Sequence, residues 1–317
     1  MYAVEINREK KVLPIASTST DMYRRDGRPS QFAPPLVPSM AGGQDGQLKH
    51  DPFPQTTRTT FHLDSRDRDY DIYPSSSEFV VELPETLNNV RSAVLVTAEL
   101  PISYYVFSAA RGNTHLRVTL GPVTQEVTIP DGNYTTTSMA AALKTALELS
   151  FPGTTFVVGF DAATLKCVIT SSAGILSIDT TAAVKRTEWG LGYYLGFARG
   201  VVTTNVTSTV TGSRVAAMNP ENYLLLDIGE LNGLSQSALY AAGGSGRKTF
   251  AKVPLNGESY QYNFFDKTVT YTEQRPQITR LDRLRVSVRF HDGSLVDLNG
   301  AEWSLSIEFA CTLTRVL

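Results

Sequence analysis

The feature that most constrains the fold is an alternation of apolar and polar residues that recurs from Thr59 almost to the C-terminus. Period-2 alternation is typical of strands with one face in a core, and Asp292-Gly293 between two such runs predicts a turn. The two runs beside this turn are Leu284, Val286, Val288 and Phe290, and then Trp303, Leu305, Ile307, Phe309, Cys311 and Leu313. Earlier runs are Phe61 and Leu63; Phe79, Val81 and Leu83; Val90, Val94, Val96, Ala98 and Leu100; and Leu116, Val118 and Leu120. We therefore expect an all-β fold, with these segments as half-buried strands of a β-sandwich.

One segment breaks the alternation. After a turn at Asp131-Gly132-Asn133-Tyr134, apolar residues follow helical spacing behind a Thr/Ser start signal: Met139, Ala142, Leu143, Ala146 and Leu147. Strands are predicted next around 155–160 and 165–170, the second one alternating Leu165, Cys167 and Ile169. Residues 130–200 are therefore predicted to be a small α+β insertion. Residues 222–229 return to strand, and the Gly-rich stretch 234–247 is most simply a long surface loop.

Residues 1–55 differ from the rest of the chain. They are rich in Pro, Ser, Gln, Gly and Met, and they show no sustained period. Such a segment cannot bury enough surface by itself to offset its ordering entropy. It is either a disordered tail or an extended arm that orders on another subunit, and we favour the arm. The predicted domains are thus the arm, 1–55, and a β-sandwich, 56–317, that carries the insertion.

Charge and composition exclude several classes of function. The formal net charge is −2, and the first 50 residues carry only seven Lys and Arg against five Asp and Glu, too little for a nucleic-acid-binding arm. No apolar run approaches the roughly 20 residues that span a bilayer. The N-terminus lacks the order of a secretory signal, so folding in the cytoplasm fits. Cys167 and Cys311 fall in alternating runs and are predicted to be buried free thiols rather than a bridge.

Motifs that would indicate an enzyme are missing from the sequence. None of His50, His62, His115 and His291 has a second His or Cys three to five residues away, as a zinc-type pair would. There is no G-x-S-x-G elbow, and Gly243 to Thr249 has the wrong spacing for a phosphate-binding loop. We therefore predict no catalytic, cofactor-binding or metal-binding residue, no cofactor and no enzymatic activity.

Two further features have a functional and a structural interpretation. The charged run from Asp64 to Asp69 alternates Asp and Arg, and if extended it suits salt bridges to an adjacent strand or subunit better than acid/base catalysis. The second feature is aromatic: these residues could form a sugar-binding surface, although packing is the commoner role. They are Tyr104, Tyr105, Phe107, Tyr193 and Tyr194. Asn133 and Asn205 begin N-x-T patterns, which matter only in a secreted chain.

A series of short motifs over residues 59–310, in this order, resembles minor capsid proteins of large nucleocytoplasmic DNA viruses. The first motifs are Phe61 to Asp69, Tyr73-Pro74, Phe79, Leu83-Pro84 and Ala98 to Pro101. Next come Arg111-Gly112-Asn113, Ile129 to Tyr134, Leu195-Gly196-Phe197, Asn219-Pro220 and Asn222 to Leu225. The last are Leu284 to Phe290, Asp292-Gly293, Asn299-Gly300 and Trp303. The arm before residue 56 shows no such match.

This resemblance implies a jelly-roll sandwich without catalytic activity, placed in the icosahedral shell of a virion. Its partners would be the major capsid protein and other minor capsid proteins. Members of this group either cement capsomers or form the pentamer at the vertices, and a long arm favours the cementing role, since about 55 extended residues reach well over 100 Å. An alternative from another class is a glycan-binding or host-attachment module, because jelly rolls also serve as lectins.

Overall fold

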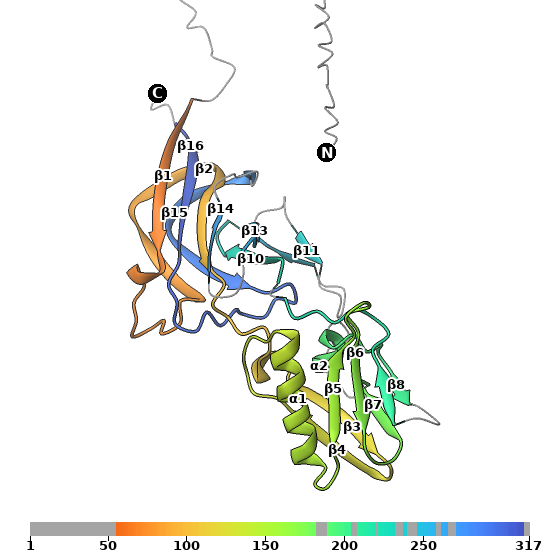
Figure 1. Ribbon diagram of the computed structural model, residues 1–317. Helices are drawn as coiled ribbons and strands as arrows, with labels where there is room; N and C mark the ends of the chain where they lie inside the picture. Colours follow the sequence, from red (N-terminus) through yellow and green to blue (C-terminus); the bar gives the residue numbers. More distant parts are fainter. Residues whose placement is uncertain are drawn as a thin grey trace, which may run out of the picture. The chain divides into compact units, whose positions relative to one another are not determined.

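The structure is a computed structural model (Figure 1). It describes residues 55–181, 189–203, 208–219, 221–231, 237–239, 246–257, 261–265 and 271–313. The predicted arm therefore lies outside the described residues, apart from Gln55, and so do His50 and Asn205. The division of the chain into an arm, a sandwich and an insertion stays a prediction.

The largest element is a curled antiparallel sheet of seven strands, in the order β1-β16-β2-β15-β10-β13, with β14 also paired to β2. Its strands are β1 (Thr56–Asp64), β2 (Glu78–Pro101), β10 (Tyr223–Ile228), β13 (Ala251–Pro254), β14 (Tyr262–Phe265), β15 (Tyr271–Arg289) and β16 (Ser304–Thr312). β1, from the beginning of the described chain, pairs along its whole length with β16, from the end. Strands on both sides of the predicted Asp292-Gly293 turn thus flank β2, as the alternation predicts.

The long strand β2 changes its inward face along its length. The sequence predicts that Val90, Val94, Val96, Ala98 and Leu100 share one face. In the structure Val96 is exposed, whereas its neighbour Leu95 is fully buried, so this prediction is wrong. The pairing with β16 skips a residue of β2 at Val96 and another at Arg91. Each bulge adds one residue to β2, and because side chains alternate with period 2, one extra residue exchanges the two faces.

Two smaller antiparallel sheets and a helix come from residues 115–211. One sheet has the order β4-β3-β7-β8 and the other β5-β6-β9. Their strands are β3 (His115–Leu120), β4 (Val123–Thr128), β5 (Phe156–Phe160), β6 (Cys167–Ser171), β7 (Leu176–Asp179), β8 (Val201–Thr203) and β9 (Thr209–Thr211). Three short helices complete the described fold: η1 (Ser65–Asp67), η2 (Ala109–Arg111) and α2 (Gly190–Tyr194).

The helix α1 (Thr136–Ser150) begins where the sequence predicts it. A capping box of Thr135 and Ser138 satisfies backbone donors of its first turn. Met139, Leu143 and Leu147 are fully buried, and the helix packs against β5 and β4. Since β5 pairs with β6, the predicted apolar stripe does face the sheet that contains 167–170.

Three local predictions are wrong. Leu165 does not belong to the strand: it has a positive φ of 54° in the turn before β6, and it is exposed. Leu313 follows the end of β16 and is also exposed. The stretch 234–247 is not simply a loop, because β11 (Ser237–Leu239) pairs with β12 (Gly246–Lys248). Strands of three residues are too short to produce a visible alternation, which explains the last error.

The predicted fold class, an all-β jelly-roll-like sandwich with a small α+β portion, is confirmed. Trp303 is buried, as an inward residue of the last run should be. Cys167 and Cys311 are buried free thiols, and burial raises the pKa of Cys167 to about 12. Among the described residues, no helix is both long and apolar enough to cross a membrane.

Candidate interaction surface

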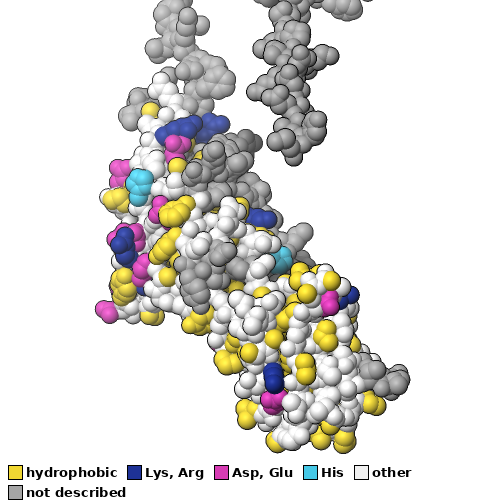
Figure 2. All heavy atoms as spheres, in the orientation of Figure 1, with side chains coloured by type: hydrophobic (Ala, Val, Ile, Leu, Met, Phe, Trp, Pro, Cys, Tyr) yellow, Lys and Arg dark blue, Asp and Glu magenta, His cyan; other side chains and the backbone are white. Residues whose placement is uncertain are grey.

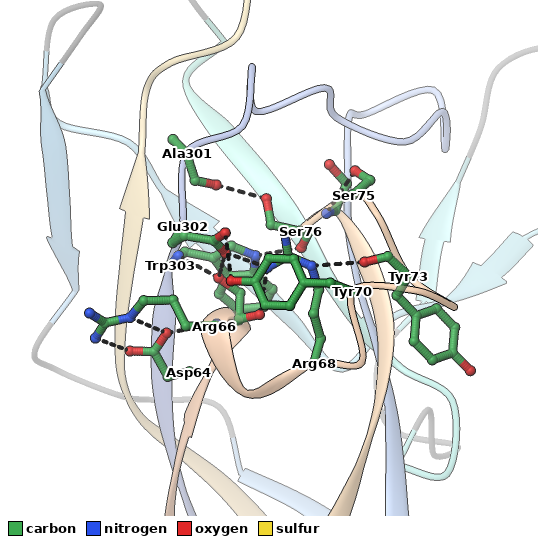
Figure 3. Close-up of polar contacts among 12 residues, drawn as sticks. Asp64, Arg66, Arg68, Tyr70, Tyr73, Ser75, Ser76, Ala301, Glu302 and Trp303 are labelled. Carbon is green, nitrogen blue, oxygen red and sulfur yellow. Dashed lines mark hydrogen bonds and ion pairs between the residues drawn. The ribbon is translucent and has the colours of Figure 1, made fainter.

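The charged run from Asp64 to Asp69 folds around one buried arginine (Figure 3). Arg68 is only 6% exposed. Its guanidinium donates hydrogen bonds to the carbonyl oxygens of Ser65, at 2.6 Å, and Tyr73, at 2.9 Å, and to Glu302 Oε2 at 2.6 Å. We call these residues, together with Trp303, the Arg68 cluster. A buried arginine with a carboxylate partner and two carbonyl acceptors is fully used in holding the fold.

The Arg68 cluster fastens the end of β1 to the start of β16. Ser65 Oγ accepts a hydrogen bond from the Trp303 amide and donates one to Glu302. The indole Nε1 of Trp303 donates to the carbonyl of Ser76 at 2.7 Å, and its ring meets Phe79 edge-on. Burial raises the pKa of Glu302, but the hydrogen bonds from Arg68 and Ser65 outweigh this and leave that pKa below its ordinary value.

The charged run is not extended, because Ser65–Asp67 form the helical turn η1. Asp64 caps η1 by accepting the amide of Arg66, and the Arg66 side chain returns to the same carboxylate, with 2.6 Å between Nη2 and Oδ2. The pairing with Arg66 is the main reason why the pKa of Asp64 is lowered. Arg68 forms a salt bridge with Glu302, which lies just before β16.

A shallow groove of about 540 Å³ opens beside the Arg68 cluster, on the outer face of the large sheet. It is lined by Asp64, Arg66, Glu99, Tyr262, Phe264, Glu302, Trp303 and Ser304. Two rings stand out in it: Tyr262 is 52% exposed and Phe264 is 71% exposed. Both come from β14, which pairs with the end of β2. Figure 2 shows hydrophobic side chains next to acidic ones on the surface over β1, β16 and β2.

The carboxylates of this groove are not equivalent. Asp64 is paired with Arg66, and Glu302 with Arg68. Glu99 accepts a hydrogen bond from Ser304, and no ion pair to Glu99 is found among the described residues. In the antiparallel pair of β14 and β2, Phe264 stands directly opposite Glu99, so the exposed ring and this carboxylate are neighbours on one face. Within the described residues, the groove therefore offers a carboxylate without an ion pair beside an exposed aromatic ring.

A second, partly buried arginine ties the smaller sheets to the large one. The Arg111 guanidinium donates to Glu221 Oε1 at 2.6 Å and to the carbonyl of Val106 at 3.0 Å, and it lies 4.2 Å from the centre of the Phe290 ring. The hydroxyl of Tyr104 accepts the amide of Glu221. Burial raises the pKa of Tyr104, so this hydroxyl stays neutral. Arg111 thus connects η2 with the residues next to β10 and at the end of β15.

The Asn residues of two motifs hold the segment that leaves β2. The Asn113 side chain accepts the amide of Ser108 and donates to the carbonyl of Val106. The Asn133 side chain accepts the amide of Val106 at 2.7 Å. Phe107 and Gly132 exchange two backbone hydrogen bonds. These motif residues therefore form a structural joint.

The motif Leu195-Gly196-Phe197 has a similar explanation. Gly196 has a φ of +82°, and a Cβ built there would lie 2.2 Å from the carbonyl oxygen of Arg214. No other residue can take this conformation at this distance. The glycine is needed for the backbone to pass, and not for a ligand.

The other candidates from the sequence do not come together as a site. Tyr104, Phe107 and Tyr194 are buried and pack in the core, Tyr193 is partly buried, and Tyr105 is partly exposed. The described histidines lie on separate strands or ends: His62 bonds Ser306, His115 bonds Thr128, and His291 bonds Tyr223. Across the described parts of the chain, no group of three or more His, Cys, Asp or Glu could hold a metal ion. The region 243–249 lies partly outside the described residues.

Sequence reasoning did not assign Glu99, Tyr262 or Phe264 to a common surface. A signal exists in the alternation of Tyr262 and Phe264, but it is only two residues long. Glu99 ends a run that reads like any half-buried strand. Only the pairing of β14 with β2 and of β2 with β16 brings these residues to one place.

Comparison with known proteins identifies no family for this chain. No protein-family model and no curated protein matches the sequence. Among solved structures, the crystal structure of a selenomethionine-labelled mavirus penton protein is similar, with 12% sequence identity and a TM-score of 0.46. The match covers 80% of this chain and 99% of that one. A likeness this low carries no argument about function.

Proposed function

We propose that this chain is a structural minor capsid protein of a large icosahedral DNA virus, which cements capsomers through subunit interfaces and its N-terminal arm. It has no catalytic role and works in the virion beside the major capsid protein and other minor capsid proteins. The observation that carries the proposal is the ordered series of motifs over residues 59–310 that resembles this group.

The contacts of the motif residues support a structural role. Arg68, Trp303, Arg111 and Asn133 each use their polar atoms inside the fold. Side chains that serve catalysis must instead converge on a space where a substrate can lie. A protein that functions through its surface needs a rigid frame, and this is what these residues build.

Deletion of residues 1–55 tests the proposal. An arm that becomes ordered only on a neighbouring subunit adds nothing to the sandwich core. The large interface that it forms there offsets the conformational entropy lost on ordering. The truncated chain should therefore keep a melting temperature close to that of the full chain. Its incorporation into particles, measured by the amount of protein in purified virions, should fall strongly.

Two results would contradict the proposal. A truncated chain that is incorporated normally makes residues 1–55 dispensable, and one that no longer folds makes them part of the domain. Electron microscopy of purified particles also separates the cementing role from the vertex role, since a penton would occur only as pentamers at the five-fold positions. A glycan-binding module would instead bind sugar arrays and be absent from the shell lattice.

A further inference from the structure

We infer that the groove beside the Arg68 cluster receives an arginine-bearing segment from the arm of a second copy of this chain, residues 22–28. This inference rests on the proposed assembly function and adds the surface at which the arm binds. The chemistry of the groove, the sequence of the arm and the reach of the chain support this contact.

The groove matches an arginine more closely than any other side chain. A guanidinium stacks on an aromatic face and at the same time forms paired hydrogen bonds with a carboxylate. Phe264, 71% exposed, and Glu99 stand opposite each other in the strand register, so one guanidinium can use both. The ring of Tyr262, 6.5 Å from that of Phe264 and tilted by 31°, offers a second face for stacking.

The neighbouring charges favour one added cation. Asp64 and Glu302 are already neutralised by Arg66 and Arg68, and Glu99 is the lining carboxylate with no ion pair found in the described part of the chain. Part of the desolvation cost of a docked arginine is therefore offset by Glu99, which breaks no ion pair with another described residue to bind it. A purely apolar ligand would leave Glu99 covered and unpaired, which costs energy.

The arm has one segment of matching chemistry. Residues 22–28 read Met-Tyr-Arg-Arg-Asp-Gly-Arg, with three arginines against one aspartate and a tyrosine beside them. The other basic stretch, at residues 8–11, has two lysines and a single arginine. Because an ammonium lacks the planar fork, it gains less from a ring and a carboxylate together. The chain between residue 28 and β1 has 27 residues, which can span up to about 90 Å and so can reach an adjacent subunit.

The test uses full-length chains and a charge exchange. One variant carries Glu99→Arg, and the other carries Arg24→Glu with Arg25→Glu. In the first variant the arginine placed in the groove repels the arginines of the arms. In the second variant Glu99 in the groove repels the glutamates placed in the arms. Each variant alone should therefore sediment as a monomer. Mixed together, the glutamate arms of one variant can enter the arginine grooves of the other. The mixture should therefore regain the association of the wild type, with an affinity within about tenfold of it.

Matched controls separate the groove from other exposed apolar positions. Phe264→Ser should weaken self-association about tenfold or more, whereas Leu149→Ser, at an 81% exposed residue of α1, should leave it unchanged. Melting temperatures of all variants show that each one is folded. Trypsin gives an independent readout, because cleavage after Arg24 and Arg25 should be slower than after Lys10 and Lys11 in the wild type, and equally fast in Glu99→Arg.

Several outcomes would overturn the inference. A wild-type chain that stays monomeric, with equal cleavage at both basic stretches up to its highest soluble concentration, excludes the contact. Protection that is unaffected by dilution assigns the groove to the chain's own arm. A mixture that does not associate excludes the pairing of these charges. Incorporation into particles is measured separately, so loss of the groove contact with normal incorporation refutes this inference and leaves the proposed function standing.

Discussion

The large sheet and the region of smaller sheets are built from contacts of very different range. β1 pairs with β16, and the hydrogen bond between His62 and Ser306 joins residues 244 positions apart. In the smaller region β3 and β4 form a tight hairpin, with Leu120 opposite Val123, and α1 follows directly. A contact between residues close in the sequence closes a short loop at a low entropic cost. A contact between residues far apart in the sequence closes a long loop, forms late, and benefits from further interactions where the paired strands end.

The two regions also differ in how buried arginine side chains contribute to them. The large sheet has the Arg68 cluster at the point where its two chain ends meet, and Arg111 stands at the joint with the smaller region. The smaller region is held chiefly by an apolar stripe, in which Met139, Leu143 and Leu147 are fully buried. We therefore expect the two regions to respond differently to apolar and to polar substitutions.

The largest effect is expected from Leu143→Asp in the smaller region. A charge without a partner at a fully buried position should lower the free energy of unfolding by about 3–5 kcal/mol. Denaturant unfolding followed by circular dichroism measures this. The matched control is Leu149→Asp on the same helix, at an 81% exposed position, which should change stability by less than about 0.5 kcal/mol. Equal melting temperatures of wild type and Leu143→Asp would contradict the packing of α1.

A smaller loss is expected from Arg68→Met in the large sheet. The substitution keeps the apolar stem but removes the guanidinium that donates to Glu302 and to the carbonyls of Ser65 and Tyr73. We expect a loss of about 2–3 kcal/mol, near the lower end for a broken buried pair because the Glu302 side chain is 26% exposed. Arg66→Met is the control, since Arg66 is 70% exposed and its loss should change stability little. An equal response of the two variants would mean that the cluster does not fasten the sheet.

A still smaller effect should depend on pH through Glu302. Its pKa in the folded chain lies below the ordinary value of 4.5, because hydrogen bonds from Arg68 and Ser65 outweigh the burial that raises it. The contribution of this lowered pKa to stability is therefore complete above about pH 4.5 and is lost as the pH falls further. The difference in unfolding free energy between the wild type and Glu302→Gln should shrink below pH 4.5. A difference that stays constant from pH 6 to pH 3 would contradict the ion pair.

The last prediction uses the two buried cysteines as reporters of local opening. Cys167 lies in β6 of the smaller region and is 0% exposed, whereas Cys311 lies near the end of β16 and is 9% exposed. Thiol labelling of the native chain should be slow at both cysteines, and faster at Cys311, because Cys311 keeps some exposure whereas Cys167 is fully buried. Mass spectrometry after timed labelling separates the sites, and Cys311→Ser isolates the other reporter. Faster labelling at Cys167 would contradict the prediction and would mean that the smaller region opens before the end of β16.

Much of the fold was predictable because its signals are local. Alternation before and after Asp292-Gly293 identified β15 and β16, helical spacing identified α1, and the position of the cysteines in apolar runs identified buried thiols. Each of these patterns depends only on residues within a few positions of one another. Such patterns survive in the folded chain when one face meets a core.

The features that could not be predicted depend on pairing between distant segments. The bulges at Arg91 and Val96 exchange the faces of β2, and they arise from its register with β16. The partner of Arg68 is Glu302, 234 residues away, and nothing near Asp64 to Asp69 identifies it. The groove likewise exists only because β14 sets Phe264 opposite Glu99. Local patterns identified most of the residues that face a core, whereas the register between strands, set by the packing of the whole sheet, determined where those faces change and which outward residues meet.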